Sequence, residues 1–402
     1  MITIKTEDLR VKSLSSLKSR LTKISRSPVP DFAVHKEELS KLDSILKKYS
    51  KFKNLIIIAN GGSQSTFRAF HHALVPMGNE RKVFFLTSME PDLIDMVKVR
   101  FAPKKTLVMP ISKSGDTVGV LESLFAFSEY TVLPVTSPNK GALFELAQKM
   151  GWDIIPHPEI GGRFSGITAS AYAPALFCGI NVEEIDKGTS EIYKQCHPSV
   201  PVDKNPALDL ACRLFMLEKK GYSEIFCPVY SCRLFGFALF IMQIIHETVG
   251  KQGKGQTIYT ADAPESQHHT NQRFFGGHKN VIGLFVNLEH QDDEVMKVHV
   301  PEELHHIRLR DGTLSDIDKV AYAKAFSFEY QGTYKDAVNS RIPVATVTLD
   351  KISPFSIGEF LGFWHYVAVY SAMLRQVDPF DQPQVENSKK ISFELRRRLS
   401  KE

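Results

Sequence analysis

The sequence lacks the features that mark several specialised classes of protein. No apolar run is long enough to span a membrane, and the first residues do not show the pattern of a secretory signal. Five cysteines are scattered through 402 residues without a CxxC pair, which argues against a zinc site or a disulfide framework and is typical of a reducing cytoplasm. We therefore expect a cytoplasmic globular protein with no membrane partner and enough residues for two domains.

Nucleotide and zinc motifs are missing as well. Neither GxxxxGK[ST] nor GxGxxG occurs, so a bound nucleotide is not indicated. The zinc motif HExxH is incomplete, because Gly250 stands where its second histidine would be. No cluster of cysteine, histidine and acidic residues has the spacing of metal ligands, so we expect no metal site.

Positive charge is concentrated at the start of the chain. Residues 1–53 contain 13 Lys and Arg against 6 Asp and Glu, whereas the whole chain has a net charge of only +5. A basic arm could bind nucleic acid. Acidic residues are interspersed with the basic ones, however, and this favours a solvated pair of amphipathic helices with no nucleic-acid partner.

Apolar runs alternate with helical patterns in two stretches of the chain. Strands are predicted at 54–59, 83–86, 106–109 and 131–135, with helices near 65–75, 91–98, 117–128 and 141–150. After residue 205 the pattern restarts, with strands at 223–229, 256–260, 281–286 and 344–349 and helices at 206–220, 232–248 and 356–375. Such alternation indicates parallel sheets covered on both faces.

The predicted fold is therefore α/β, with two doubly wound parallel-sheet domains, each an α/β/α sandwich. The domains are expected at 51–180 and 206–375, joined by a proline-containing connection at 181–205. A basic helical arm at 1–50, with a helix at 34–50, precedes them. A C-terminal segment at 376–402 follows them.

Two loops that follow predicted strands and precede predicted helices could bind an anion. The first is Asn60-Gly61-Gly62-Ser63 and the second is Ser112-Lys113-Ser114-Gly115-Asp116-Thr117. Hydroxyl groups and free backbone N–H groups at a helix N-terminus favour phosphate. The second loop alone could instead be a helix cap with a turn glycine, but three hydroxyls and a lysine in six residues favour phosphate binding.

Further charged groups could take part in chemistry. Arg163 follows two glycines, Glu247 lies at the end of an apolar helix beside a glycine-rich turn, and His268 lies in ESQHHTNQRFFGG. Taken singly, Glu247 could be a capping or surface residue and His268 one of a surface pair. Lys389 begins a basic C-terminal helix.

Five segments together resemble the glucose-6-phosphate isomerase family, over roughly residues 50–390. SKSGDT resembles the phosphate loop of sugar isomerase (SIS) domains. EIGGRFS at 159–165 and FDQPQVENSK at 380–389 resemble the two signatures of the family. HETVGK resembles the family's Glu-Ser-x-Gly-Lys segment, and Gln267-His268 with Gly277 resembles its Gln-His pair with a glycine nine residues later.

The resemblance implies a role for each matching residue. Glu247 is implied as the base, Arg163 as the group that stabilises the enediolate, and His268 and Lys389 as the pair that opens the ring. The remaining matches are implied substrate ligands: Ser63, Ser112, the backbone of Lys113, Ser114, Thr117 and Gln382. Two positions depart from the family, Gly119 where glutamate is usual and Gln384 where glycine is usual. Glu122, one helical turn from Gly119, could substitute for the missing carboxylate.

The implied function is aldose–ketose isomerisation of glucose 6-phosphate and fructose 6-phosphate, in glycolysis and gluconeogenesis, without a metal or redox cofactor. The resemblance also implies a homodimer in which His268 enters the partner's site. Two alternatives stay open: an isomerase of another hexose phosphate, including one that accepts both glucose and mannose 6-phosphates, and a non-catalytic sugar-phosphate-binding protein. A sugar aminotransferase is disfavoured, because Met1-Ile2-Thr3 lacks a glutaminase cysteine.

Overall fold

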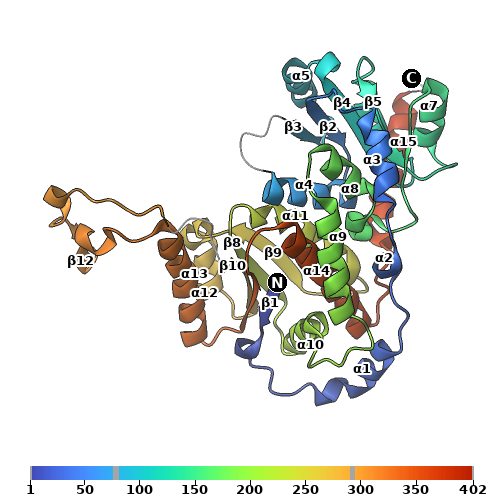
Figure 1. Ribbon diagram of the computed structural model, residues 1–402. Helices are drawn as coiled ribbons and strands as arrows, with labels where there is room; N and C mark the ends of the chain where they lie inside the picture. The colour runs from blue at the N-terminus through green and yellow to red at the C-terminus, as the bar shows by residue number, and fades with distance from the viewer. Residues whose placement is uncertain (1, 76–80, 290–294, 401–402) are drawn as a thin grey trace.

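The computed structural model describes residues 2–75, 81–289 and 295–400, and its framework is two sheets flanked by helices (Figure 1). The first sheet has the order β3-β2-β4-β6-β7, with β5 beside β4, and all its pairs are parallel. Its strands are β2 (Asn54–Ile58), β3 (Lys82–Leu86), β4 (Thr106–Ser112), β5 (Thr131–Val132), β6 (Val135–Thr136) and β7 (Ile155–Pro156). Its helices are α4 (Gly62–Leu74), α5 (Pro91–Arg100), α6 (Val118–Phe125) and α7 (Ala142–Met150). The predicted strand 131–135 is interrupted at Pro134, which has no N–H to donate.

The second sheet has the order β1-β13-β10-β8-β9. Four of its strands are parallel to one another: β8 (Glu224–Tyr230), β9 (Thr257–Asp262), β10 (Val281–Leu288) and β13 (Val344–Leu349). The fifth, β1 (Ile2–Lys5), pairs antiparallel to β13 at the edge, with Ile2 opposite Leu349. The helices are α10 (Pro206–Glu218), α11 (Ala238–Val249), α12 (Thr270–Gly276), α13 (Tyr322–Asn339) and α14 (Pro354–Arg375). The α/β fold with parallel sheets is therefore confirmed, with one antiparallel edge strand.

The prediction that the N-terminal arm is a solvated pair of helices is wrong. Its first residues form strand β1, followed by the short helices α1 (Lys18–Ser25) and α2 (Asp31–Val34), and α3 (Leu39–Lys47) begins five residues later than the predicted helix 34–50. Leu9, Leu17 and Phe32 are buried in the main core. The apolar residues of the arm are thus part of the fold, and most of its lysines and arginines are exposed. Arg20 is half-buried and donates to the Leu374 carbonyl oxygen.

The predicted connection at 181–205 contains a helix that the sequence analysis missed. Helix α9 (Val182–Gln195) packs along α14, and α8 (Ala169–Phe177) precedes it. The Asn181 side chain caps α9 by accepting a hydrogen bond from the Glu184 N–H at 3.1 Å, and Pro198 and Pro201 come only after the helix ends. The domain limits themselves stay a prediction.

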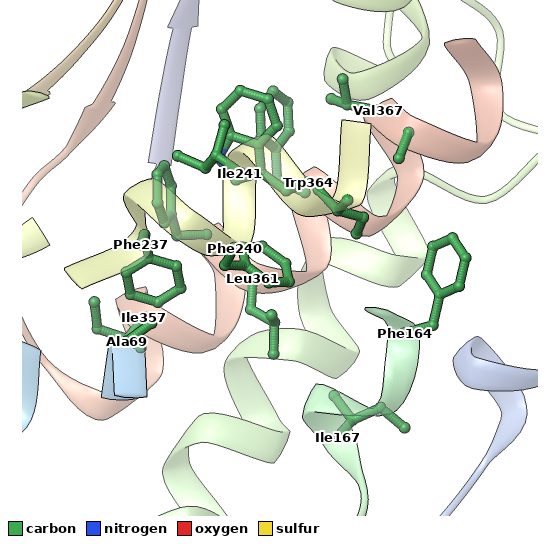
Figure 2. Close-up of a cluster of buried hydrophobic side chains, with 14 of the residues drawn as sticks. Ala69, Phe164, Ile167, Phe237, Phe240, Ile241, Ile357, Leu361, Trp364 and Val367 are labelled. Atoms are coloured by element: carbon green, nitrogen blue, oxygen red, sulfur yellow. The ribbon is translucent and has the colours of Figure 1, made fainter. Parts of the chain in front are cut away.

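Helix α14 is buried around nearly its whole circumference, as expected for a helix surrounded by other elements. Figure 2 shows apolar side chains from α14, α11, α4 and the two 3₁₀ turns Gly162–Ile167 and Leu234–Phe237 meeting in one cluster. The labelled members are Ala69, Phe164, Ile167, Phe237, Phe240, Ile241, Ile357, Leu361, Trp364 and Val367. This cluster joins the helices of the two sheets into one core.

Two segments extend from this body. Residues 295–321, here called the hairpin arm, contain β11 (Arg308–Leu309) and β12 (Gly312–Thr313) and project away from the sheets before α13 (Figure 1). Helix α15 (Glu386–Leu399) ends the described chain and has no buried residue. Within the described ranges, we find no helix with the length and apolarity needed to cross a membrane.

The contact between α9 and α14 generates a stability prediction. A Cβ atom at Gly188 would lie 1.9 Å from the Phe355 carbonyl oxygen, so Gly188→Ala should lower the free energy of unfolding by about 2 kcal/mol or more through overpacking. Gly332 in α13 is the matched control, because a Cβ there meets nothing within 4 Å. Gly332→Ala should instead stabilise by roughly 0.5–1 kcal/mol. Urea unfolding of both variants tests this, and equal midpoints would contradict it.

Candidate active site

A buried arginine lies where the two sheet units and the C-terminal segment meet. Arg163, in the turn Gly162–Ile167, has a side chain only 2% exposed. Its Nε donates to Thr248 Oγ1 at 3.0 Å, Nη1 donates to Glu247 Oε2 at 3.3 Å and to Gln382 Oε1, and Nη2 donates to the carbonyl oxygens of Pro379 at 2.7 Å and Asp381 at 2.8 Å. A guanidinium has five N–H donors, so these five acceptors use all of them. The structure thus brings Arg163, Glu247 and Gln382 together.

A close backbone contact at Gly62 explains where the Arg163 turn lies. A Cβ at Gly62 would lie 2.2 Å from the Gly162 carbonyl carbon, so the start of α4 and the Arg163 turn touch backbone to backbone. Only glycine permits this approach. Ser63, in the first turn of α4, is held beside the turn for the same reason: its N lies 4.0 Å from the place of a Cβ on Gly162.

Burial lowers the pKa of the Arg163 guanidinium from its ordinary value, and the Glu247 carboxylate opposes this. The group stays a cation, since arginine starts so far above neutral pH.

Glu247 lies in the last turn of α11 and is held by two donors. Its Oε2 accepts from Arg163, and its Oε1 accepts from Gln243 Nε2 at 2.9 Å. Gln243 in turn accepts from Ser65 Oγ of α4 at 2.9 Å. The carboxylate is 31% exposed, so it is oriented by neighbours and still open on one side. The sequence analysis missed Gln243, although its place four residues before Glu247 on one helix was a usable signal.

The loop predicted to bind phosphate joins β4 to α6. Ser112 ends the strand and Thr117 is the N-cap of the helix, and their hydroxyl oxygens lie 2.8 Å apart. Gly115 has φ +74°, a backbone conformation that would be strained for a residue with a side chain, and Ser114 is exposed. The Lys113 Nζ lies 3.5 Å from Glu159 Oε2, so its side chain faces Glu159. Lys140 and Lys113 together hold the pKa of the Glu159 carboxyl below its ordinary value. Hydroxyls and backbone donors thus converge at a helix N-terminus, an arrangement suited to an anion.

Two predicted site residues lie apart from this centre in the single chain. His268, in the turn Glu265–His268, is exposed. Lys389 lies on α15 with a side chain 64% exposed, and its Nζ pairs with Glu386 Oε1 at 2.8 Å. Among the residues that the structure describes, neither has a polar contact with Arg163 or Glu247. Their roles stay predictions.

The structure also bears on the Gly119 departure. Glu122 forms an ion pair with Arg396 of α15, whose Nη2 lies 2.9 Å from its Oε2. This pairing disfavours the hypothesis that Glu122 replaces the missing carboxylate. A Cβ at Gly119 would lie 3.4 Å from Met89 Sδ and 3.7 Å from the Asn60 side-chain amide, so it would be in ordinary van der Waals contact with both. In the described part of the chain, no three acidic, histidine or cysteine side chains are placed to hold a metal ion.

Comparison with known proteins gives consistent matches. The sequence model of one family, phosphoglucose isomerase, matches residues 45–402. A glucose-6-phosphate isomerase of Acholeplasma laidlawii is 26% identical over 377 residues, covering 90% of this chain and 87% of that protein. One from Methanocaldococcus jannaschii is also 26% identical, over 404 residues, covering 98% of this chain and 96% of its own.

Solved structures show the same fold. A hypothetical protein of Thermus thermophilus aligns with a TM-score of 0.87 at 23% identity, over 99% of this chain and 100% of that chain. A glucose-6-phosphate isomerase of Chlamydia trachomatis aligns with a TM-score of 0.81 at 17% identity, over 99% of this chain and 89% of that chain.

Replacing Arg163 should both destabilise the protein and release the C-terminal segment. Arg163→Leu leaves Glu247, Thr248 and two carbonyl groups without their shared donor, which should cost about 3 kcal/mol or more in the free energy of unfolding. Arg396→Leu is the control, because its ion pair with Glu122 is partly exposed and should contribute about 1 kcal/mol or less. Equal losses in chemical unfolding of the two variants would show that Arg163 does not organise the site.

Proposed function

This chain belongs to the phosphoglucose isomerase family and is an aldose–ketose isomerase, and we propose that it interconverts glucose 6-phosphate and fructose 6-phosphate in glycolysis and gluconeogenesis. The observation that carries the proposal is the Glu247 carboxylate, held between Gln243 and Arg163 and open to solvent on one side. The reaction moves a proton between C1 and C2 of the open sugar through an enediol or enediolate. A positioned carboxylate can remove and return that proton.

The substrate's phosphate supplies the anchor in this proposal. Ser112, Ser114, Thr117 and the backbone of Lys113 bind it at the start of α6, and Ser63 faces the sugar. Gln382 extends this contact set from the C-terminal segment. Holding the far end of the sugar fixes the distance from C2 to Glu247, which lowers the entropic part of the barrier.

Arg163 stabilises the charge that develops on the enediolate. All of its N–H donors are engaged in the substrate-free chain, so a direct hydrogen bond to the intermediate requires one of them to change partner. Glu247 becomes neutral when it takes the C2 proton, and this weakens its hold on Nη1 as negative charge appears on the substrate. The arginine therefore stays beside one negative charge throughout the reaction, without a change in its own protonation.

Ring opening is assigned to His268 and Lys389, and the exposed position of His268 suits a homodimer in which it enters the partner's site. The hairpin arm supports an interface on the same side of the molecule, since it projects near α12 and α13 (Figure 1). Its apolar side chains include Val295, which is 89% exposed, and Met296, Ile307 and Ile317. Exposed apolar residues in one segment are typical of a surface that a partner covers. A cytoplasmic location completes the proposal.

The glycine at position 119, where the family has glutamate, favours one second candidate, an isomerase that also accepts mannose 6-phosphate. A carboxylate that would contact sugar hydroxyls in the family is absent, and Met89 and Asn60 are the side chains nearest to Gly119. Turnover measured on both sugars decides between the candidates. A non-catalytic sugar-phosphate-binding protein would turn over neither.

Glu247→Gln should abolish isomerisation while leaving binding of the sugar phosphate nearly intact. The amide keeps the shape of the side chain but cannot accept the C2 proton, and loss of a general base typically costs about 10²–10⁴-fold in kcat. A coupled assay of fructose 6-phosphate conversion, together with solvent deuterium exchange at C2, measures this. Glu129→Gln, at an exposed glutamate, is the control. More than about a tenth of wild-type turnover in Glu247→Gln would remove Glu247 as the base.

Mixing two inactive variants tests the shared site. In a dimer of one His268→Ala and one Glu247→Gln subunit, one site carries both defects and the other carries neither. Random reassortment makes about half of the dimers mixed, so roughly a quarter of wild-type activity should return. If subunits exchange, as followed by mass spectrometry, and no activity returns, His268 does not act across an interface.

A further inference from the structure

We propose that Lys251 is a positioning residue for the isomerisation, and that its ion pair with Asp381 places Gln382 opposite Glu247. Lys251 lies two residues beyond the end of α11, four residues after Glu247, and its side chain is only 5% exposed. Its Nζ lies 2.7 Å from Asp381 Oδ1 and also donates to the Asp378 carbonyl oxygen. A lysine ammonium group is seldom buried without such partners. The acceptors in the C-terminal segment therefore offset the cost of burying the Lys251 side chain.

Asp381 is held twice, by two cations from distant parts of the chain. Lys251 binds its carboxylate, and Arg163 donates to its carbonyl oxygen at 2.8 Å. The residue directly after it is Gln382, whose side chain accepts from the same arginine. Both the carboxylate and the carbonyl oxygen of Asp381 are therefore held in place. Because Gln382 is the next residue, its backbone position is restricted as well.

The segment has few other means of order. In the described chain, residues 376–385 belong to no strand, and they form one short 3₁₀ turn, Pro383–Val385. The Phe380 ring lies beside that of Phe164, tilted by 59° with centroids 5.6 Å apart, and Phe380 is 49% exposed. A segment with so little secondary structure opens easily unless specific contacts hold it. The polar contacts of Lys251 and Arg163 connect this segment to helix α11, which carries the proposed base Glu247.

The turn after α11 supplies a matched comparison for Lys251. Gly253 and Gly255 have φ of +68° and +102°, and between them Lys254 donates to the Arg375 carbonyl oxygen at 3.0 Å. The two lysines are three residues apart and both hold the chain as it leaves α14. Only Lys251 reaches the residues next to Gln382, whereas Lys254 is exposed and acts at the helix end. Lys254→Met therefore removes a similar contact without the proposed function.

The test is a double-mutant cycle between positions 251 and 382, with kcat/KM for the isomerisation as the readout. This readout rests on the proposed isomerase function. Lys251→Met should lower kcat/KM on the order of 10- to 100-fold, the usual cost of misplacing a site by about 1 Å. In Gln382→Ala the same change should cost less than about twofold, because Lys251 acts through Gln382. Lys251→Arg should restore part of the activity, and Lys254→Met should stay within about twofold of wild type. A loss at Lys251 that adds fully to Gln382→Ala would overturn the proposal.

Hydrogen exchange gives a readout that does not depend on the reaction. Amides in a peptide covering residues 377–385 should exchange at least about tenfold faster in Lys251→Met than in wild type, and Lys254→Met should leave them unchanged. Unchanged exchange in Lys251→Met would overturn the proposal that Lys251 holds this segment, even if activity fell. If wild type failed to isomerise either sugar phosphate, the proposed function would be wrong, and the exchange result would still decide whether Lys251 holds the segment. Asp381→Asn, which removes the other partner, keeps the test available if Lys251→Met does not fold.

Discussion

The burial of one guanidinium constrains the whole site. A buried charged group needs an acceptor for each of its donors, because a buried donor without an acceptor destabilises the folded state by its full desolvation penalty. Arg163 finds its acceptors in two places, the end of α11 and the C-terminal segment. Those segments cannot move independently without leaving a donor unpaired. The base, its neighbour Thr248 and the backbone before Gln382 are thus held in one arrangement by one side chain.

The core explains why this arrangement is rigid enough for chemistry. Helix α11, which carries Glu247, packs against α14 and α4, and α14 is buried nearly all round. The Arg163 turn contributes Phe164 and Ile167 to the same apolar cluster (Figure 2). Arginine and glutamate therefore extend from elements whose apolar faces already share a core. Close packing of this kind resists displacement, so the polar contacts need only set the final orientation of each side chain.

Local sequence patterns predicted the elements that have local causes. Most strands of both sheets were found from apolar runs, and the loop 112–117 from hydroxyls that follow a strand, because each signal lies within a few residues. The two-residue strand β7 was not predicted. Strand β1 was missed since it is four residues long and pairs with β13, more than 340 positions away. Helix α9 was missed because three prolines at 198–206 suggested a connection, although they follow the helix. The triple contact of Arg163, Glu247 and Gln382 spans up to 219 positions, so no periodicity could reveal it, and only the family resemblance placed these residues at one site.

The positions of His268 and Lys389 illustrate the opposite limit. Both residues match the family's motifs, yet in a single chain both are exposed and lie apart from the base. Motif matching identifies a residue type at a position, whereas the distance between two residues depends on every element that connects them. Lys389 lies in the first turn of α15, which begins directly after the 3₁₀ turn Pro383–Val385, so the contacts that hold Gln382 also influence where α15 begins. In the part of the chain that the structure describes, His268 has no comparable connection to Arg163. The proposed dimer would account for this, since a two-fold assembly would bring the histidine of each copy to the site of the other.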